Sequence, residues 1–205
     1  MTMSTRRVFL IGAMGAAAAA IASCTPKKTP ERPKPPLLGE PAAPKRFVMW
    51  GSYTCPFTAQ LVVILNGIVA SMPKTVSVEW RHFPIHPPDP ALHVAGLGFK
   101  DEHFWGFTNR VLGEVLEKGG EYTGLTPDKL AEFAKAEGGS EETLAAAYAD
   151  KAKWDAVKED LLAGRLLGVT QTPALFHQGY FMTPNGLPLD LASFEKSLRT
   201  MLQQD

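Results

Sequence analysis

The chain has 205 residues with 21 basic and 21 acidic side chains, so its formal net charge is zero. It carries no basic stripe, which argues against a nucleic-acid partner, and its glycines lack the spacing of a phosphate-binding loop. Two cysteines are too few for a small domain that depends on disulfides for its stability. Without the leader and tether described next, about 160 residues remain, which suits one domain with a proper core.

Residues 1–24 are predicted to be an export leader. Paired arginines precede an Ala-rich apolar run that is too short and too weakly hydrophobic for a stable membrane-spanning helix. The start resembles a twin-arginine (Tat) export signal. Ile21–Cys24 resembles a bacterial lipobox, in which the peptide is cut before the cysteine and its sulfur is lipidated. We therefore expect a periplasmic lipoprotein held to a membrane through Cys24; the alternative is ordinary signal cleavage near the same small residues.

Residues 25–44 are predicted to be a Pro-rich tether, and residues 45–205 the folded domain. Seven prolines alternate with charged side chains in the tether, a composition that buries little and favours extended, polyproline-like conformations. Behind a lipid anchor, such a stiff spacer would hold the domain away from the membrane surface. The alternative is an unanchored, disordered N-terminus of the same composition.

The folded domain is predicted to open with a strand, a helix and a second strand. An apolar run predicts a buried strand over 46–53. Pro56 suits the first turn of the helix that follows, to about residue 71, because its missing N–H would be unpaired there anyway. Alternating apolar and polar residues predict the second strand over 76–83. Two parallel strands joined by a right-handed crossover follow from this order.

The pattern from about 90 to 166 is almost wholly helical, and we place a helical insertion at about 90–155. A short strand is predicted over 174–177, then a hairpin turn at Gln178-Gly179 and a closing amphipathic helix over 189–203. The fold class predicted from this order is α/β, a small sheet with an inserted helical domain.

Cys55 lies in Thr54-Cys55-Pro56-Phe57-Thr58, at the predicted start of the first helix. Unpaired backbone N–H groups and the helix dipole favour a negative charge there, so the position should expose a sulfur and activate it as a thiolate. The usual redox pattern at such a turn is Cys-x-x-Cys, but here the fourth residue is Thr58. The chain therefore carries a nucleophile without a resolving thiol.

Four segments together resemble the DsbA-type branch of the thioredoxin superfamily, which comprises exported thiol–disulfide oxidoreductases. They are the strand-to-Cys55 junction, Arg81–Pro87, the following helix with Phe104-Trp105, and Gly168–Phe176. The resemblance implies a thioredoxin-like fold with a helical insertion (DsbA-like).

The same resemblance implies a substrate-binding site beside the sulfur. It makes Pro173 the family's cis-proline and gives the backbone of Thr172 the role of pairing with an extended peptide. Pro56 and Phe57 join these two residues in the predicted substrate-binding set. The alternative is that Thr172-Pro173 is trans and only starts a strand.

The sequence departs from this family in two places. Thr58 replaces the resolving cysteine; it can hydrogen-bond to the Cys55 thiolate but cannot attack a mixed disulfide, so an outside thiol must do so. Met49 and Ser52 occupy positions where many members carry a buried acid. The resolving thiol and the buried acid are therefore missing together.

The leading interpretation is an enzyme that acts through one nucleophilic cysteine, by thiol–disulfide exchange, isomerisation or mixed-disulfide reduction. Its expected partners are exported cysteine-containing proteins or glutathione-like thiols. The alternatives are a one-cysteine peroxidase, with Ser52 as the hydroxyl residue, a non-catalytic peptide- or protein-binding lipoprotein, and a metal-handling protein. We expect no cofactor, and no metal because the histidines lack ligand spacing.

Overall fold

The computed structural model describes residues 32–183 and 190–203. The predicted leader with Cys24, the first part of the predicted tether (25–31) and residues 184–189 lie outside the described residues. The described part belongs to one structural unit, Glu31–Asp205. Within it, no helix is both long and apolar enough to cross a membrane.

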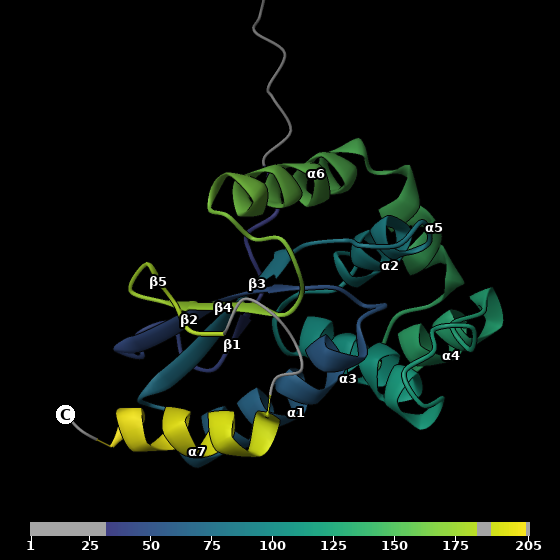
Figure 1. Ribbon diagram of the computed structural model, residues 1–205. Helices are drawn as coiled ribbons and strands as arrows, with labels where there is room; N and C mark the ends of the chain where they lie inside the picture. Colours follow the sequence, from purple (N-terminus) through teal and green to yellow (C-terminus); the bar gives the residue numbers. More distant parts are fainter. Residues whose placement is uncertain (1–31, 184–189, 204–205) are drawn as a thin grey trace, which may run out of the picture. The chain divides into compact units, whose positions relative to one another are not determined.

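Five strands of the described residues form one mixed sheet in the order β1-β3-β2-β4-β5 (Figure 1). The strands are β1 (Leu37–Leu38), β2 (Lys45–Gly51), β3 (Val76–His82), β4 (Ala174–His177) and β5 (Tyr180–Phe181). β2 and β3 are parallel, with Met49 beside Trp80, whereas β4 pairs antiparallel with β2. The parallel opening pair and the terminal hairpin predicted from the sequence are confirmed.

Helices cover both faces of the sheet (Figure 1). The helices are α1 (Pro56–Ser71), α2 (Asp89–Gly96), α3 (Asp101–Glu117), α4 (Pro127–Ala136), α5 (Glu141–Ala149), α6 (Lys151–Leu166) and α7 (Leu191–Leu202). α1 and α7 contact each other on one face, and α6 crosses the other face against β3. Helices α2 to α6 form the helical insertion, which runs past the predicted end near 155 because α6 continues to Leu166.

Local sequence signals explain where these elements begin and turn. Pro56 is the first residue of α1, and the side chain of Thr126 caps α4 by accepting from the Lys129 N–H at 3.3 Å. The β4–β5 hairpin turns at Gln178 (φ 50°) and Gly179 (φ 83°). Two consecutive positive φ angles are the geometry of a tight hairpin turn, which the Gln-Gly pair predicts.

The folded part begins earlier than the predicted boundary at residue 45. β1 pairs antiparallel with β3, with Leu37 opposite Glu79, and the Trp80 N–H donates to the Pro36 carbonyl at 2.9 Å. An edge strand has unpaired N–H and C=O groups, and a short neighbouring segment can satisfy them even within a proline-rich sequence. The second half of the predicted tether is therefore attached to the sheet.

The main core lies between β2 and β3 and the helices α1 and α3. Its largest fully buried side chains are Trp80, Tyr53, Phe47, Phe104 and Phe107. Gly51, the last residue of β2, is needed here because a Cβ at this position would lie 2.6 Å from the Trp80 ring. This close packing fixes the backbone from which the chain turns toward Cys55.

Candidate functional site

Cys55 lies at the N-cap of α1, with extended backbone angles (φ −102°, ψ 116°). No side chain caps this helix end, and its first turn holds no acidic residue. Cys55 is the one free cysteine of the described residues. The N–H groups at the start of α1 are therefore available to a negative charge on the Cys55 sulfur.

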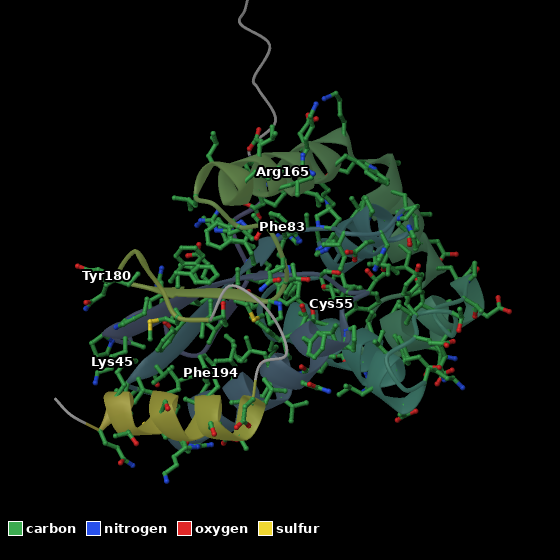
Figure 2. The ribbon with its side chains drawn as sticks, in the orientation of Figure 1. Lys45, Cys55, Phe83, Arg165, Tyr180 and Phe194 are labelled. Carbon is green, nitrogen blue, oxygen red and sulfur yellow. The ribbon has the colours of Figure 1, made fainter. Side chains whose placement is uncertain are left out.

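The backbone carbonyl of Thr172 lies directly beside the sulfur. Cys55 Sγ donates to Thr172 O at 3.2 Å, which joins the start of α1 to the loop before β4. The Thr172-Pro173 peptide bond is cis, as the family resemblance implied. Figure 2 shows Cys55 where the sheet meets the start of α1, well apart from Tyr180 in the β4–β5 hairpin.

The prediction of an exposed sulfur is wrong, because Cys55 is only 5% exposed. Its side chain turns inward to Thr172, which is itself buried. On the neighbouring side, the glycine turn after α3 lies against Pro56, since a Cβ at Gly120 would come within 3.1 Å of the Pro56 ring. Pro56 and Phe57 are half-buried beside the sulfur, and Pro173 is buried.

The Thr58 hydroxyl has a different partner from the one expected. It is fully buried and accepts from the Ser52 N–H at 3.4 Å, so it bonds to the loop before Cys55 rather than to the sulfur. Thr58 therefore fastens the first turn of α1 to the end of β2. Among the predicted site residues, the structure brings Cys55 and Thr172 into direct contact.

An acid that sequence reasoning missed supports the loop before Cys55. Met49 is a core residue, but Ser52 Oγ donates to Asp89 Oδ2 at 2.6 Å. Asp89, the first residue of α2, also accepts from the Tyr53 N–H (3.0 Å) and the Ile85 N–H (2.9 Å). A carboxylate from the helical insertion thus lies where the first strand lacks one.

Two buried histidines continue from this carboxylate into the core. His93 Nε2 lies 3.4 Å from Asp89 Oδ1, and His93 Nδ1 lies 2.8 Å from His82 Nδ1. Trp80 Nε1 donates to the same His82 nitrogen at 3.1 Å.

The environment shifts two of these pKa values. Burial acts to raise the pKa of Asp89, but the charge of His93 and the hydrogen bonds from His93, Ser52 and Ile85 lower it overall. Burial, followed by the charges of His93, Arg32 and Arg81, holds the pKa of His82 well below its usual range. His82 is therefore neutral at neutral pH.

One sequence signal could have found the Asp89–His93 pair: the two residues are four apart on a helix and so share a face. Spacing along the chain instead draws attention to His82 and His86, and the prolines around Asp89 obscure the helix start. The described residues contain no group of three or more His, Cys, Asp or Glu side chains that could hold a metal ion.

A second buried carboxylate joins α6 to β3. Asp160 accepts from Arg81 Nη1 at 3.0 Å and from the His82 N–H at 3.1 Å, and it also pairs with Arg32. The Trp50 indole N–H donates to the Asp160 carbonyl at 3.2 Å. This cluster holds the last helix of the insertion over the end of the strand that precedes Asp89.

The family model described as thioredoxin matches residues 31–196. No curated protein matches the chain by sequence. Solved structures with a similar fold include a protein-disulfide isomerase from Novosphingobium aromaticivorans, with a TM-score of 0.68 and 19% identity over 85% of this chain and 100% of that one.

Two further structures have the same fold. One is a periplasmic thioredoxin-like protein from Salmonella enterica serovar Typhimurium, with a TM-score of 0.62 and 22% identity over 80% of this chain and 90% of that one. The other is the thiol-disulfide exchange protein alpha-DsbA2 from Wolbachia pipientis, with a TM-score of 0.64 and 18% identity over 82% and 87%.

Proposed function

The chain belongs to the thioredoxin family, and on that premise we propose that it is an exported thiol–disulfide oxidoreductase that acts through Cys55 alone. The observation that carries the proposal is the placement of Cys55 Sγ at the N-terminus of α1, 3.2 Å from the backbone of Thr172. A helix start stabilises the thiolate, and the backbone of a neighbouring loop can bind an extended peptide. The descriptions of the similar structures agree with this chemistry.

The resting thiol and the attacking thiolate use the Thr172 carbonyl differently. While Cys55 is protonated, its S–H donates to that carbonyl. Ionisation removes the donor, so the Thr172 carbonyl becomes free to accept from a backbone N–H of the substrate. The same loop can thus bind the peptide at the moment when the sulfur becomes nucleophilic.

The proposed reaction has two exchange steps. The Cys55 thiolate attacks one sulfur of a substrate disulfide, which forms a mixed disulfide with Cys55 and releases the other sulfur as a thiolate. A second thiol then attacks the mixed disulfide and restores the Cys55 thiolate. If that thiol belongs to the substrate, a different substrate disulfide forms and the substrate is isomerised. If it is glutathione-like, the substrate sulfur leaves as a mixed disulfide with glutathione, and a second glutathione thiol must attack that bond to give the free substrate thiol and glutathione disulfide.

The location of this activity is part of the proposal. We assign the protein to the periplasm as a lipoprotein anchored through Cys24, because the leader has the features of a twin-arginine signal followed by a lipobox. Exported proteins with cysteines would then be its substrates. Lipid attachment at Cys24 also removes the second sulfur of the chain from any pairing with Cys55.

Reaction with glutathione disulfide tests the proposal. A Cys24→Ser chain, in which any adduct must form on Cys55, is expected to gain one glutathionyl group by intact mass and to lose it when reduced glutathione is added. The matched control, Cys24→Ser/Cys55→Ser, should gain none. Failure of the Cys55-containing chain to form an adduct, in vitro or with exported proteins in cells, contradicts the proposed chemistry.

A second candidate is a non-catalytic binding protein that holds extended peptides against the Thr172 loop. The 5% exposure of Cys55 favours it, because a substrate disulfide must reach a sulfur that is almost covered. This candidate predicts equal peptide binding by the unmodified protein and Cys55→Ser, with no covalent adduct. The oxidoreductase predicts adducts that disappear with Cys55→Ser.

A further inference from the structure

The hydrogen bonds around His93 determine where its protons lie. An indole N–H can only donate, so the bond from Trp80 Nε1 makes His82 Nδ1 an acceptor. With His82 Nδ1 as an acceptor, we assign the donor role in its 2.8 Å contact to His93 Nδ1, so that the two N–H groups share the one lone pair of His82 Nδ1. The other ring nitrogen, His93 Nε2, faces Asp89 Oδ1 at 3.4 Å; it is buried and has no hydrogen-bond partner within the part of the chain that the structure describes.

We propose that Asp89 and His93 form a buried carboxylate–imidazolium pair that positions the Cys55 loop, and this inference rests on the proposed function. A neutral His93 that donates from Nδ1 would direct a lone pair from Nε2 at the carboxylate. A protonated ring directs an N–H there instead, and each charge then has its counterion within the core. Both side chains are fully buried.

The carboxylate is linked to the residue before Cys55 through two hydroxyl groups. Ser52 Oγ gives its proton to Asp89, so the Thr54 hydroxyl, 3.1 Å away, must donate to Ser52 Oγ. The Thr54 N–H donates to the same oxygen at 3.1 Å. Asp89 therefore accepts from Ser52 Oγ and the Tyr53 N–H directly and orients the Thr54 donors through Ser52, so it takes the place of the acid that the positions of Met49 and Ser52 lack.

The other titratable groups packed around Asp89 and His93 are either neutral or already paired. Burial keeps His82 of β3 neutral and raises the pKa of Tyr53, whose hydroxyl is bonded to Thr108 of α3 at 2.8 Å. Asp160 of α6 is matched by Arg81 and Arg32 on the far side of His82. The charge opposite Asp89 is thus supplied by His93.

The proposal is tested first by the nitrogen NMR signals of the His93 ring in the unsubstituted protein. Both ring nitrogens are expected to carry a proton in the folded protein, because one faces His82 Nδ1 and the other faces the Asp89 carboxylate. Asp89→Asn should return His93 to a neutral ring, because the counterion is gone. A neutral His93 ring in the unsubstituted protein at about pH 7 overturns the proposal.

The second test is the reaction rate of Cys55 in the Cys24→Ser background. Asp89→Asn and Ser52→Ala are each expected to slow the reaction about tenfold, as loss of one charge-assisted hydrogen bond does. The double variant should be no slower than the slower single variant, because both act through one link. Asp128→Asn, an exposed aspartate in the first turn of α4, is the matched control and should react at the parent rate.

Each rate is measured with glutathione disulfide and with iodoacetamide, which separates this inference from the proposed function. If the parent chain alkylates but never forms a glutathione adduct, the proposed function fails while the alkylation rates still test the pair. Parent-rate alkylation by folded Asp89→Asn and Ser52→Ala, or strictly additive effects in the double variant, overturns the role of Asp89.

Discussion

At the scale of single residues, Thr58 is the side chain that leaves this site without a second thiol. Thr58 occupies the position three residues after the nucleophile, fully buried, and its hydroxyl accepts from the Ser52 N–H. A thiol at position 58 would lie in the first turn of α1, next to the helix start where Cys55 lies. Thr58→Cys would therefore add a second thiol to the turn that holds Cys55.

Thr58→Cys should restore an internal resolving step. In the Cys24→Ser background, excess glutathione disulfide is expected to leave an intramolecular disulfide between Cys55 and the introduced thiol, detected as the loss of two hydrogens by intact mass. Losing the hydroxyl acceptor should cost about 1 kcal/mol of unfolding free energy. A Thr58→Cys chain that keeps a glutathione adduct as stably as its parent contradicts this expectation.

The sequence and the family resemblance were sufficient to predict the cis-proline and the place of Cys55 at the start of α1, but not the carboxylate that contacts the loop before Cys55. Cys55 stands at a helix start, which its neighbours in the chain specify, whereas the cis form of Pro173 was implied by the family resemblance of its motif. Asp89 acts on residues 36 and 37 positions earlier, through a contact that forms only when α2 folds back onto the end of β2. Such contacts leave no periodic pattern in one sequence.

At the scale of elements, the position of α6 depends on Asp160. Its side chain is 3% exposed and accepts from Arg81 of β3 and from the His82 N–H, while its neighbour Glu159 is exposed and pairs with Arg32. Because Arg32 pairs with both carboxylates, Asp160 and Glu159 allow a direct comparison of a buried and an exposed ion-pair partner.

Asp160→Asn should lower the free energy of unfolding by about 1.5–3 kcal/mol, because hydrogen bonds to a buried charge are lost or weakened. Glu159→Gln should change it by less than about 1 kcal/mol, as is usual for an exposed ion pair. Urea unfolding followed by circular dichroism measures both. Equal effects of the two substitutions would show that burial of Asp160 is not what matters.

The elements themselves were predictable where their patterns are long. The strands at 46–53 and 76–83 and the helix from Pro56 were predicted to within a few residues, because apolar spacing and a proline mark them. β1 was not predicted, since two leucines between prolines show no alternation and pair only because β3 presents an open edge.

At the scale of the whole molecule, buried His82 makes stability depend on pH. Burial is the largest cause that lowers the pKa of His82, so the folded protein resists a proton that the unfolded chain accepts near pH 6.5. The unfolded state therefore gains protons first as the pH falls. Stability from this group is complete above about pH 6.5 and declines below it.

The free energy of unfolding should fall by up to about 1.4 kcal/mol per pH unit below about pH 6.5. Asp89, whose pKa is lowered, adds a further loss below about pH 4. Urea titrations across this range measure the slope. His82→Gln should flatten it between about pH 6.5 and about pH 5, whereas the exposed His86→Gln should not; an unchanged slope in His82→Gln would assign the acid sensitivity to another group.

The attachment of α6 to β3 extends its influence past the helix itself. From Asp160 the chain completes α6 and runs directly into the loop that ends at Thr172 and Pro173. We therefore expect a shift of α6 along the sheet to move the Thr172 carbonyl, which accepts from Cys55 Sγ. A substitution at the Asp160–Arg81 contact is therefore expected to alter thiol reactivity as well as the hold of α6 on the sheet.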